Sequence, residues 1–88
     1  MTNPSASNLK TLRLVIHGRV QGVFFRQSMQ YEAQSLAIYG WVRNRSNGTV
    51  EAVVHGDPGA VDAIVGWAKR GPAQAQVVRV EIEPADGS

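Results

Sequence analysis

The sequence predicts a single α+β domain whose elements follow the order strand, helix, strand, strand, helix, strand. Three observations lead to this prediction. Four segments alternate apolar and polar residues, which is the period of a half-buried strand, and two segments repeat apolar residues at helical spacing. An Asn-Gly pair separates the second and third alternating segments, and such a pair is typical of a tight hairpin turn. The pattern therefore indicates an antiparallel sheet packed against two helices.

A change of period marks the first strand and the first helix. Thr11–His17 alternates as a strand does, and its inner face would consist of Leu12, Leu14 and Ile16. Gly18–Val23 interrupts this alternation, and helical spacing follows from about Phe24 to Gly40, where the glycine is expected to end the helix. The apolar face of this helix would consist of Phe25, Met29, Ala33 and Leu36.

A hairpin is predicted next. Trp41–Arg45 and Thr49–His55 both alternate, with Val42 and Asn44 on one face of the first of them. Asn47-Gly48 between them is expected to form a type I′ turn, in which both central residues have positive φ. The inner face of the second strand of the hairpin would consist of Val50, Ala52 and Val54.

The second helix and the last strand complete the domain. Asp57-Pro58 supplies an N-cap and a first-turn proline, and Gly71-Pro72 ends the helix. Its apolar stripe would consist of Val61, Ile64, Val65 and Ala68. In the last strand, Arg79 and Glu81 alternate with three apolar residues that are expected to point inward: Val78, Val80 and Ile82.

This order of elements is the split β-α-β arrangement of the ferredoxin-like βαββαβ sandwich, an antiparallel sheet with two helices on one face. Residues 9–83 are predicted to form this domain, and residues 1–8 and 84–88 to form flexible tails, because both ends are small, polar and contain proline. The fold alone does not reveal the function, since it hosts enzymes, RNA-binding modules and regulatory domains.

Composition excludes several kinds of site. The 88 residues include no cysteine, which excludes disulfides, thiolate metal sites and a cysteine nucleophile. The two histidines, His17 and His55, have no carboxylate cluster beside them, so no metal site is predicted. The apolar runs are too short to span a bilayer and the start has no signal-peptide order, so the expected location is the cytoplasm. The net charge of +2 is small, but the basic residues are mostly arginine, which suits a small anionic ligand.

Gly18–Arg26 is the segment best suited to chemistry. It joins a strand end to a helix start, where several backbone N–H groups lack helical partners. The glycines would let these groups converge on an anion, and the helix dipole and the Arg26 guanidinium would add positive charge. Neither standard nucleotide-binding glycine motif is present. From spacing alone two interpretations stay open: an anion-binding nest, and glycines that only shape a tight turn.

The same residues resemble a known family. The runs that carry the resemblance are GRVQGVFFR at residues 18–26, GWVRN at 40–44 and NGTVE at 47–51, followed by Gly71-Pro72-Ala73. From about Leu12 to Glu83 the chain closely resembles the acylphosphatase family, whose fold is the one predicted above.

The resemblance implies an enzyme that hydrolyses acyl phosphates to a carboxylate and inorganic phosphate, without a metal or an organic cofactor. Arg26 matches the arginine that binds the phosphoryl group, and Asn44 matches the asparagine that orients the attacking water. The loop amides that would bind phosphate with Arg26 are those of Gln21, Gly22, Val23, Phe24, Phe25 and Arg26. A carboxylate leaves readily because its conjugate acid has a pKa of roughly 4, so this chemistry needs no general acid.

Other residues have simpler interpretations. His17 and His55 lie on the polar phase of their strands and are expected to be solvated or hydrogen-bonded, and Ser28 has no adjacent base to activate it. Arg19 is either a surface charge or a residue that steers anions. The large aromatic residues are expected to pack in the core, with Trp41 a candidate for the acyl end of the substrate: Phe24, Phe25, Trp41 and Trp67.

Two alternatives stay open. Many family members continue past the equivalent of Glu83 into a final strand that is missing here, which would leave the strand with Asn44 as a bare edge. The expected state is a monomer, and association through that exposed edge is the alternative.

The alternative function is a non-catalytic ferredoxin-like module that binds an anion or RNA. RNA is disfavoured because the middle strands lack an exposed aromatic pair, so the expected partner is a small acyl phosphate and neither nucleic acid nor membrane.

Overall fold

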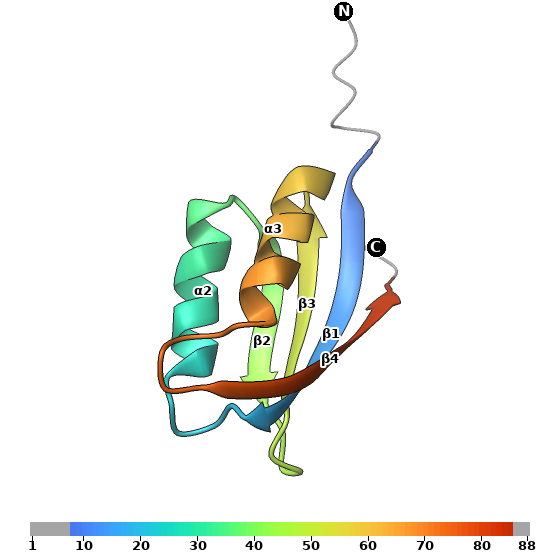
Figure 1. The fold of residues 1–88 in the computed structure, drawn as a ribbon. Helices are drawn as coiled ribbons and strands as arrows, with labels where there is room; N and C mark the ends of the chain where they lie inside the picture. Colours follow the sequence, from blue (N-terminus) through green and yellow to red (C-terminus); the bar gives the residue numbers. More distant parts are fainter. Residues whose placement is uncertain (1–7, 86–88) are drawn as a thin grey trace, which may run out of the picture.

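A computed structural model describes residues 8–85 (Figure 1). The elements are β1 (Lys10–Arg19), α2 (Phe25–Ser35), β2 (Tyr39–Asn44), β3 (Val50–Gly56), α3 (Pro58–Ala68) and β4 (Gln76–Pro84). The predicted tails at residues 1–7 and 86–88 lie outside the described residues. Strand β4 runs one residue past the predicted boundary, and the Ala85 N–H then donates to the Thr11 carbonyl at 3.1 Å.

The strands form one sheet in the order β2-β3-β1-β4, and every neighbouring pair is antiparallel. Figure 1 shows α2 and α3 side by side on one face of this sheet, while no helix of the described residues covers the other face. The arrangement confirms the predicted ferredoxin-like βαββαβ fold. Within residues 8–85, β2 and β4 are the edge strands, so Asn44 at the end of β2 lies at a sheet edge.

The core lies between the sheet and the two helices. All of the inward-facing residues predicted for β1 and β3 except the half-buried Leu12 are at most 3% exposed: Leu14, Ile16, Val50, Ala52 and Val54. The helices contribute Phe25, Met29, Val61, Ile64, Val65 and Ala68. Burying each large apolar side chain stabilises the fold by roughly 2 kcal/mol, so this layer holds the sheet against the helices.

The end of the first helix differs from the prediction. Helix α2 ends at Ser35, and the chain turns through Ala37, which has a φ of 55°. Gly40 lies inside β2 instead, with a φ of 135°. A Cβ at this position would lie 1.8 Å from the Val53 carbonyl oxygen, so the glycine serves close strand pairing and not helix termination.

The hairpin turn also differs. Gly48 has a φ of 91°, but Asn47 is not in the positive-φ region, so the turn is not type I′. The Gly48 N–H donates to the Arg45 carbonyl at 3.1 Å, and the Arg45 N–H donates to the Thr49 carbonyl at 2.9 Å. This is a three-residue loop that ends in a left-handed glycine. Asn47 acts through its side chain, whose oxygen accepts from the Thr49 N–H (3.1 Å) and hydroxyl (2.6 Å).

Two of the three residues predicted to point inward from the last strand are exposed: Val78, and Ile82, which is 42% exposed. A register shift between His17 and Gly18 pairs Gly18 with Val77, so that Val77 packs against the core. Val78 is consequently 75% exposed. Val80, opposite Ile16, lies on the core side as predicted.

Candidate active site

The start of α2 presents backbone donors that the helix itself cannot satisfy. The N-cap is Phe24, whose side chain cannot accept a hydrogen bond, and the first helical bond runs from the Ser28 N–H to the Phe24 carbonyl at 3.0 Å. The N–H groups of Phe25, Arg26 and Gln27 therefore have no helical acceptor. The first turn carries no acidic residue either. These donors, together with the positive end of the helix dipole, suit an anion.

Three buried side chains anchor the loop that leads into α2. Val20, Val23 and Phe25 are buried, whereas Gly22 and Phe24 point outward. Gly22 has a φ of 74° and Phe24 a φ of 62°. The left-handed conformation costs a residue with a Cβ about 1 kcal/mol, and the three buried neighbours hold the backbone in it. The loop is therefore a fixed structure with its amides at the surface.

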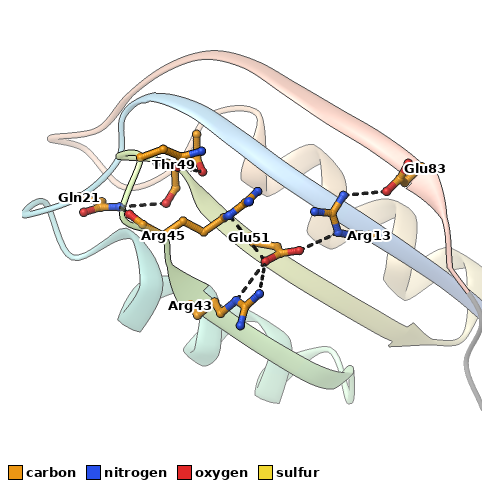
Figure 2. Close-up of polar contacts among 8 residues, drawn as sticks. Arg13, Gln21, Arg43, Arg45, Thr49, Glu51 and Glu83 are labelled. Carbon is orange, nitrogen blue, oxygen red and sulfur yellow. Dashed lines mark hydrogen bonds and ion pairs between the residues drawn. The ribbon is translucent and has the colours of Figure 1, made fainter.

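Gln21 ties this loop to the β2–β3 hairpin. Its side-chain amide donates to the Arg45 carbonyl at 2.7 Å and to the Thr49 carbonyl at 2.9 Å (Figure 2). Arg45 directly follows Asn44, so the contact links the predicted phosphate loop to the residue next to the predicted water-orienting asparagine. The Gln21 side chain thus positions the loop, which leaves only its backbone amide for a ligand.

An open hollow of about 340 Å³ brings most of the predicted site residues together. It is lined by Val20, Gly22, Phe24, Phe25, Arg26, Gln27 and Asn44. Among residues 8–85, Arg26 takes part in no ion pair, which leaves its guanidinium available to a ligand. Of the predicted phosphate-binding residues, Gln21 and Val23 do not line the hollow, because one side chain bridges to the hairpin and the other is buried.

Two aromatic residues lie elsewhere than predicted. Phe24 is 69% exposed at the hollow and not in the core, because the left-handed turn at this residue points its side chain outward. Trp41 is 46% exposed and pairs with Val53 on the uncovered face of the sheet, where the Arg43 guanidinium lies 5.0 Å from its ring. It does not line the hollow with Asn44, since residues three apart in a strand point to opposite faces. Gln27 lines the hollow but had no sequence signal beyond its place in the first helical turn.

Phe25 lies in the core and Trp67 packs against the core, as predicted, and their ring centroids are 5.2 Å apart. His17 and His55 are both hydrogen-bonded, to Glu81 and to Thr11 respectively, each at 2.5 Å. The bond from His17 lowers the pKa of the Glu81 carboxyl.

A buried carboxylate holds the hairpin from the uncovered face of the sheet. Glu51 on β3 is surrounded by arginines, as Figure 2 shows: Arg43 donates two hydrogen bonds to Oε1 (3.0 and 2.8 Å), and Arg13 donates one to Oε2 (2.6 Å). Arg13 also reaches Glu83 at 2.7 Å, and Arg45 lies 3.9 Å from Glu51. The Arg43 hydrogen bonds are the main reason why the pKa of Glu51 lies below its usual value. The alternation of apolar and polar residues does not identify these ion-pair partners, because they depend on the register of the sheet.

A second hollow, of about 300 Å³, lies along α2 and β2. Its lining includes Met29, Ala33, Ile38 and Val42 and no charged residue, so it is not suited to an anion. In the described part of the chain, no group of three or more His, Asp or Glu side chains could hold a metal ion. No helix there is long and apolar enough to cross a membrane.

Fold and site together define a small ferredoxin-like protein with a row of free amide donors, an arginine and an asparagine around one hollow. Its sequence from residue 12 to residue 88 matches the family model for acylphosphatase. An acylphosphatase of Thiobacillus denitrificans is 57% identical over 79 residues, which cover 90% of this chain and 89% of the relative. The structure is similar to that of an acylphosphatase from Coxiella burnetii, with a TM-score of 0.90, 35% identity, and coverage of 97% of this chain and 90% of the other. The acylphosphatase from Bacillus subtilis gives a TM-score of 0.83 at 35% identity, over 88% of this chain and 84% of the other. The chain therefore belongs to the acylphosphatase family, a family of hydrolases.

Proposed function

We propose that the chain hydrolyses acyl phosphates to a carboxylate and inorganic phosphate, with Arg26 and the loop amides binding the phosphoryl group and Asn44 orienting water. The observation that carries the proposal is the shared hollow. Arg26, the first turn of α2 and Asn44 all line it, and no Asp or Glu is among the lining residues. A carboxylate there would repel the anionic substrate and occupy the same donors.

The loop amides and the Arg26 guanidinium contribute different interactions to phosphate binding. The free N–H groups at the start of α2 offer short, fixed bonds to the phosphoryl oxygens, and their orientation is set before the substrate arrives. The Arg26 guanidinium adds a planar fork that can hold two oxygens at once. Both groups stabilise the charge that builds up on these oxygens during transfer.

In the proposed step, a water oxygen held by the Asn44 side-chain amide forms a bond to phosphorus, and the bond from phosphorus to the acyl oxygen breaks. The electron pair of that bond leaves with the carboxylate, which needs no proton because its conjugate acid has a pKa of roughly 4. The proton of the water passes to a phosphoryl oxygen. Asn44 orients the water and does not act as a base, since an amide does not accept a proton at neutral pH.

The test is hydrolysis of benzoyl phosphate by the purified chain, with a chelator present, and inhibition by inorganic phosphate. Arg26→Ala should lower kcat/KM by at least about 100-fold and weaken phosphate inhibition, because it removes a binding group. Asn44→Ala should lower kcat by a similar factor and change the phosphate inhibition constant less than about twofold, because it removes only the orientation of water.

Arg19→Ala is the matched control, since Arg19 is an exposed arginine at the end of β1 that does not line the hollow. It should leave both constants near the wild-type values. Absence of turnover by the folded wild-type chain would refute the proposed activity. Unchanged phosphate inhibition in Arg26→Ala would refute the role of that residue.

A further inference from the structure

The side chain of Phe24 is the most unusual feature of the hollow. Its ring is 69% exposed, it lines the hollow, and it immediately precedes the free amides of α2. Its backbone is left-handed, with a φ of 62°. A bulky residue in this conformation is an outlier in proteins.

Stability does not explain a phenylalanine at this position. An exposed ring adds little to the core, and the N-cap of a helix is better served by Ser, Thr, Asp or Asn. Glycine adopts the left-handed conformation without strain, and the same loop uses glycine for it at Gly22. The ring is therefore unfavourable in three independent respects in the free protein, which points to a ligand as its partner.

We propose that the Phe24 ring is the contact for the acyl group, and that it makes the chain select acyl phosphates with an aromatic or large apolar acyl group. This inference rests on the proposed function. A phosphoryl group bound to the amides that follow Phe24 directs its acyl oxygen away from those donors, toward the open mouth of the hollow. The exposed ring of Phe24 is the large apolar surface at that mouth.

The expected selectivity follows from the contact. An aromatic acyl group can stack on the ring in an offset or edge-to-face geometry, whereas an acetyl group offers only a methyl. Aromatic pairs of this kind correspond to a factor of about two to ten in affinity. The Phe24 ring lies on the surface and is not enclosed. The preference for aromatic acyl groups is therefore moderate, and small acyl phosphates still bind.

The experiment compares binding and turnover of paired ligands. Binding of benzoylphosphonate and acetylphosphonate, which keep the acyl group but cannot be hydrolysed, is measured by calorimetry, alongside turnover of benzoyl and acetyl phosphate. The variants are Phe24→Gly, which removes the ring and the backbone strain, Phe24→Ala, which removes the ring alone, and Phe24→Trp, which keeps an aromatic surface. Tyr31→Ala is the control, because Tyr31 is an aromatic residue on α2 that is 76% exposed and lies outside this hollow.

The wild-type chain should bind benzoylphosphonate about two- to tenfold more tightly than acetylphosphonate. Phe24→Gly and Phe24→Ala should both bring this ratio close to one. Phe24→Trp and Tyr31→Ala should keep the ratio. An unchanged ratio in both small variants, or a wild-type ratio of one, overturns the inference.

The binding ratio also separates this inference from the proposed function. If the wild-type chain hydrolyses neither acyl phosphate but its phosphonate binding ratio still falls to about one in Phe24→Gly and Phe24→Ala, the activity is refuted and the acyl contact is retained. If it hydrolyses both acyl phosphates and the phosphonate binding ratio is unchanged in the Phe24 variants, the activity is retained and the acyl contact is refuted. If it binds neither phosphonate, both are refuted.

Discussion

The bridge between Gln21 and the hairpin allows a sharp test of how the site is positioned. Gln21→Met keeps the length of the side chain and removes its donors. The two hydrogen bonds that are lost run to the Arg45 and Thr49 carbonyls at 2.7 and 2.9 Å. Both carbonyls keep a second donor, from the Gly48 N–H and the Arg45 N–H respectively, so neither becomes wholly unsatisfied.

The expected loss of stability follows from the two hydrogen bonds that Gln21→Met removes. A neutral hydrogen bond contributes about 1 kcal/mol net, and the larger penalty for an orphaned carbonyl does not apply here. The free energy of unfolding should therefore fall by about 1–2 kcal/mol, measured by urea denaturation at constant m value. Domains of this kind have about 5–15 kcal/mol of stability, so the variant stays folded under assay conditions.

The effect on turnover should exceed the effect on the folded fraction. Without the bridge, the loop and Asn44 are no longer fixed relative to one another, and small displacements of reacting groups are costly in rate. We expect kcat to fall at least tenfold, with inorganic phosphate inhibiting nearly as well as before, because the amides and Arg26 lie on one continuous segment. Gln74→Met, at an exposed loop position, should change neither quantity. Wild-type stability together with wild-type kcat in Gln21→Met would refute the reasoning.

Three further predictions concern the sheet. Glu51→Gln should lower the free energy of unfolding by about 1–3 kcal/mol, because it leaves arginines such as Arg43 without their buried counter-charge; a change within 0.3 kcal/mol, roughly the error of a urea titration, would contradict this. The depressed pKa of Glu51 contributes stability that is present above its ordinary value of 4.5 and is lost as the pH falls through the lower folded-state pKa. The urea midpoint of the wild type should thus fall more steeply below pH 4.5 than that of Glu51→Gln, and parallel curves would count against it. Gly40→Ala should lower the free energy of unfolding by more than about 3 kcal/mol, because its Cβ would clash with the Val53 carbonyl. Gly48→Ala should lower it by about 1 kcal/mol, because the space around this residue is open. Equal losses in the two variants would be inconsistent with the structure.

Periodicity predicted the fold well because the core follows it directly. The alternation in Thr11–His17 and Thr49–His55 fixed which side chains face the helices, and the buried residues of β1 and β3 agree. The predictions failed where one residue or pattern is consistent with two different structures. Gly40 is equally consistent with a helix end and with close strand pairing, and the pairing across to Val53 is a contact between residues distant in sequence. Val78 was misplaced because a register shift at Gly18 cannot be seen in the sequence of β4.

The candidate site was predictable in its composition and not in its geometry. The motif placed Arg26 and Asn44 in the right segments, and the sheet and first helix bring both to one hollow. The outward ring of Phe24 was not predictable, because an apolar residue beside the apolar Phe25 is ordinarily a core residue. It became visible only with the backbone conformation, which turns one phenylalanine inward and its neighbour outward.

Asn44 presents a structural problem, because it ends an edge strand, and edge strands fray readily. Both of its sequence neighbours are held from outside β2. Arg43 is tied through its side chain to Glu51 on β3, and Arg45 is tied through its carbonyl to Gln21 in the loop. The backbone of Asn44 is thus fixed on two sides while its own side chain is left to line the hollow. Gln21 and Glu51 thus restrict a residue that the sheet edge alone would leave mobile, which is why Gln21→Met should lower kcat although the Gln21 side chain has no proposed role in the chemical step.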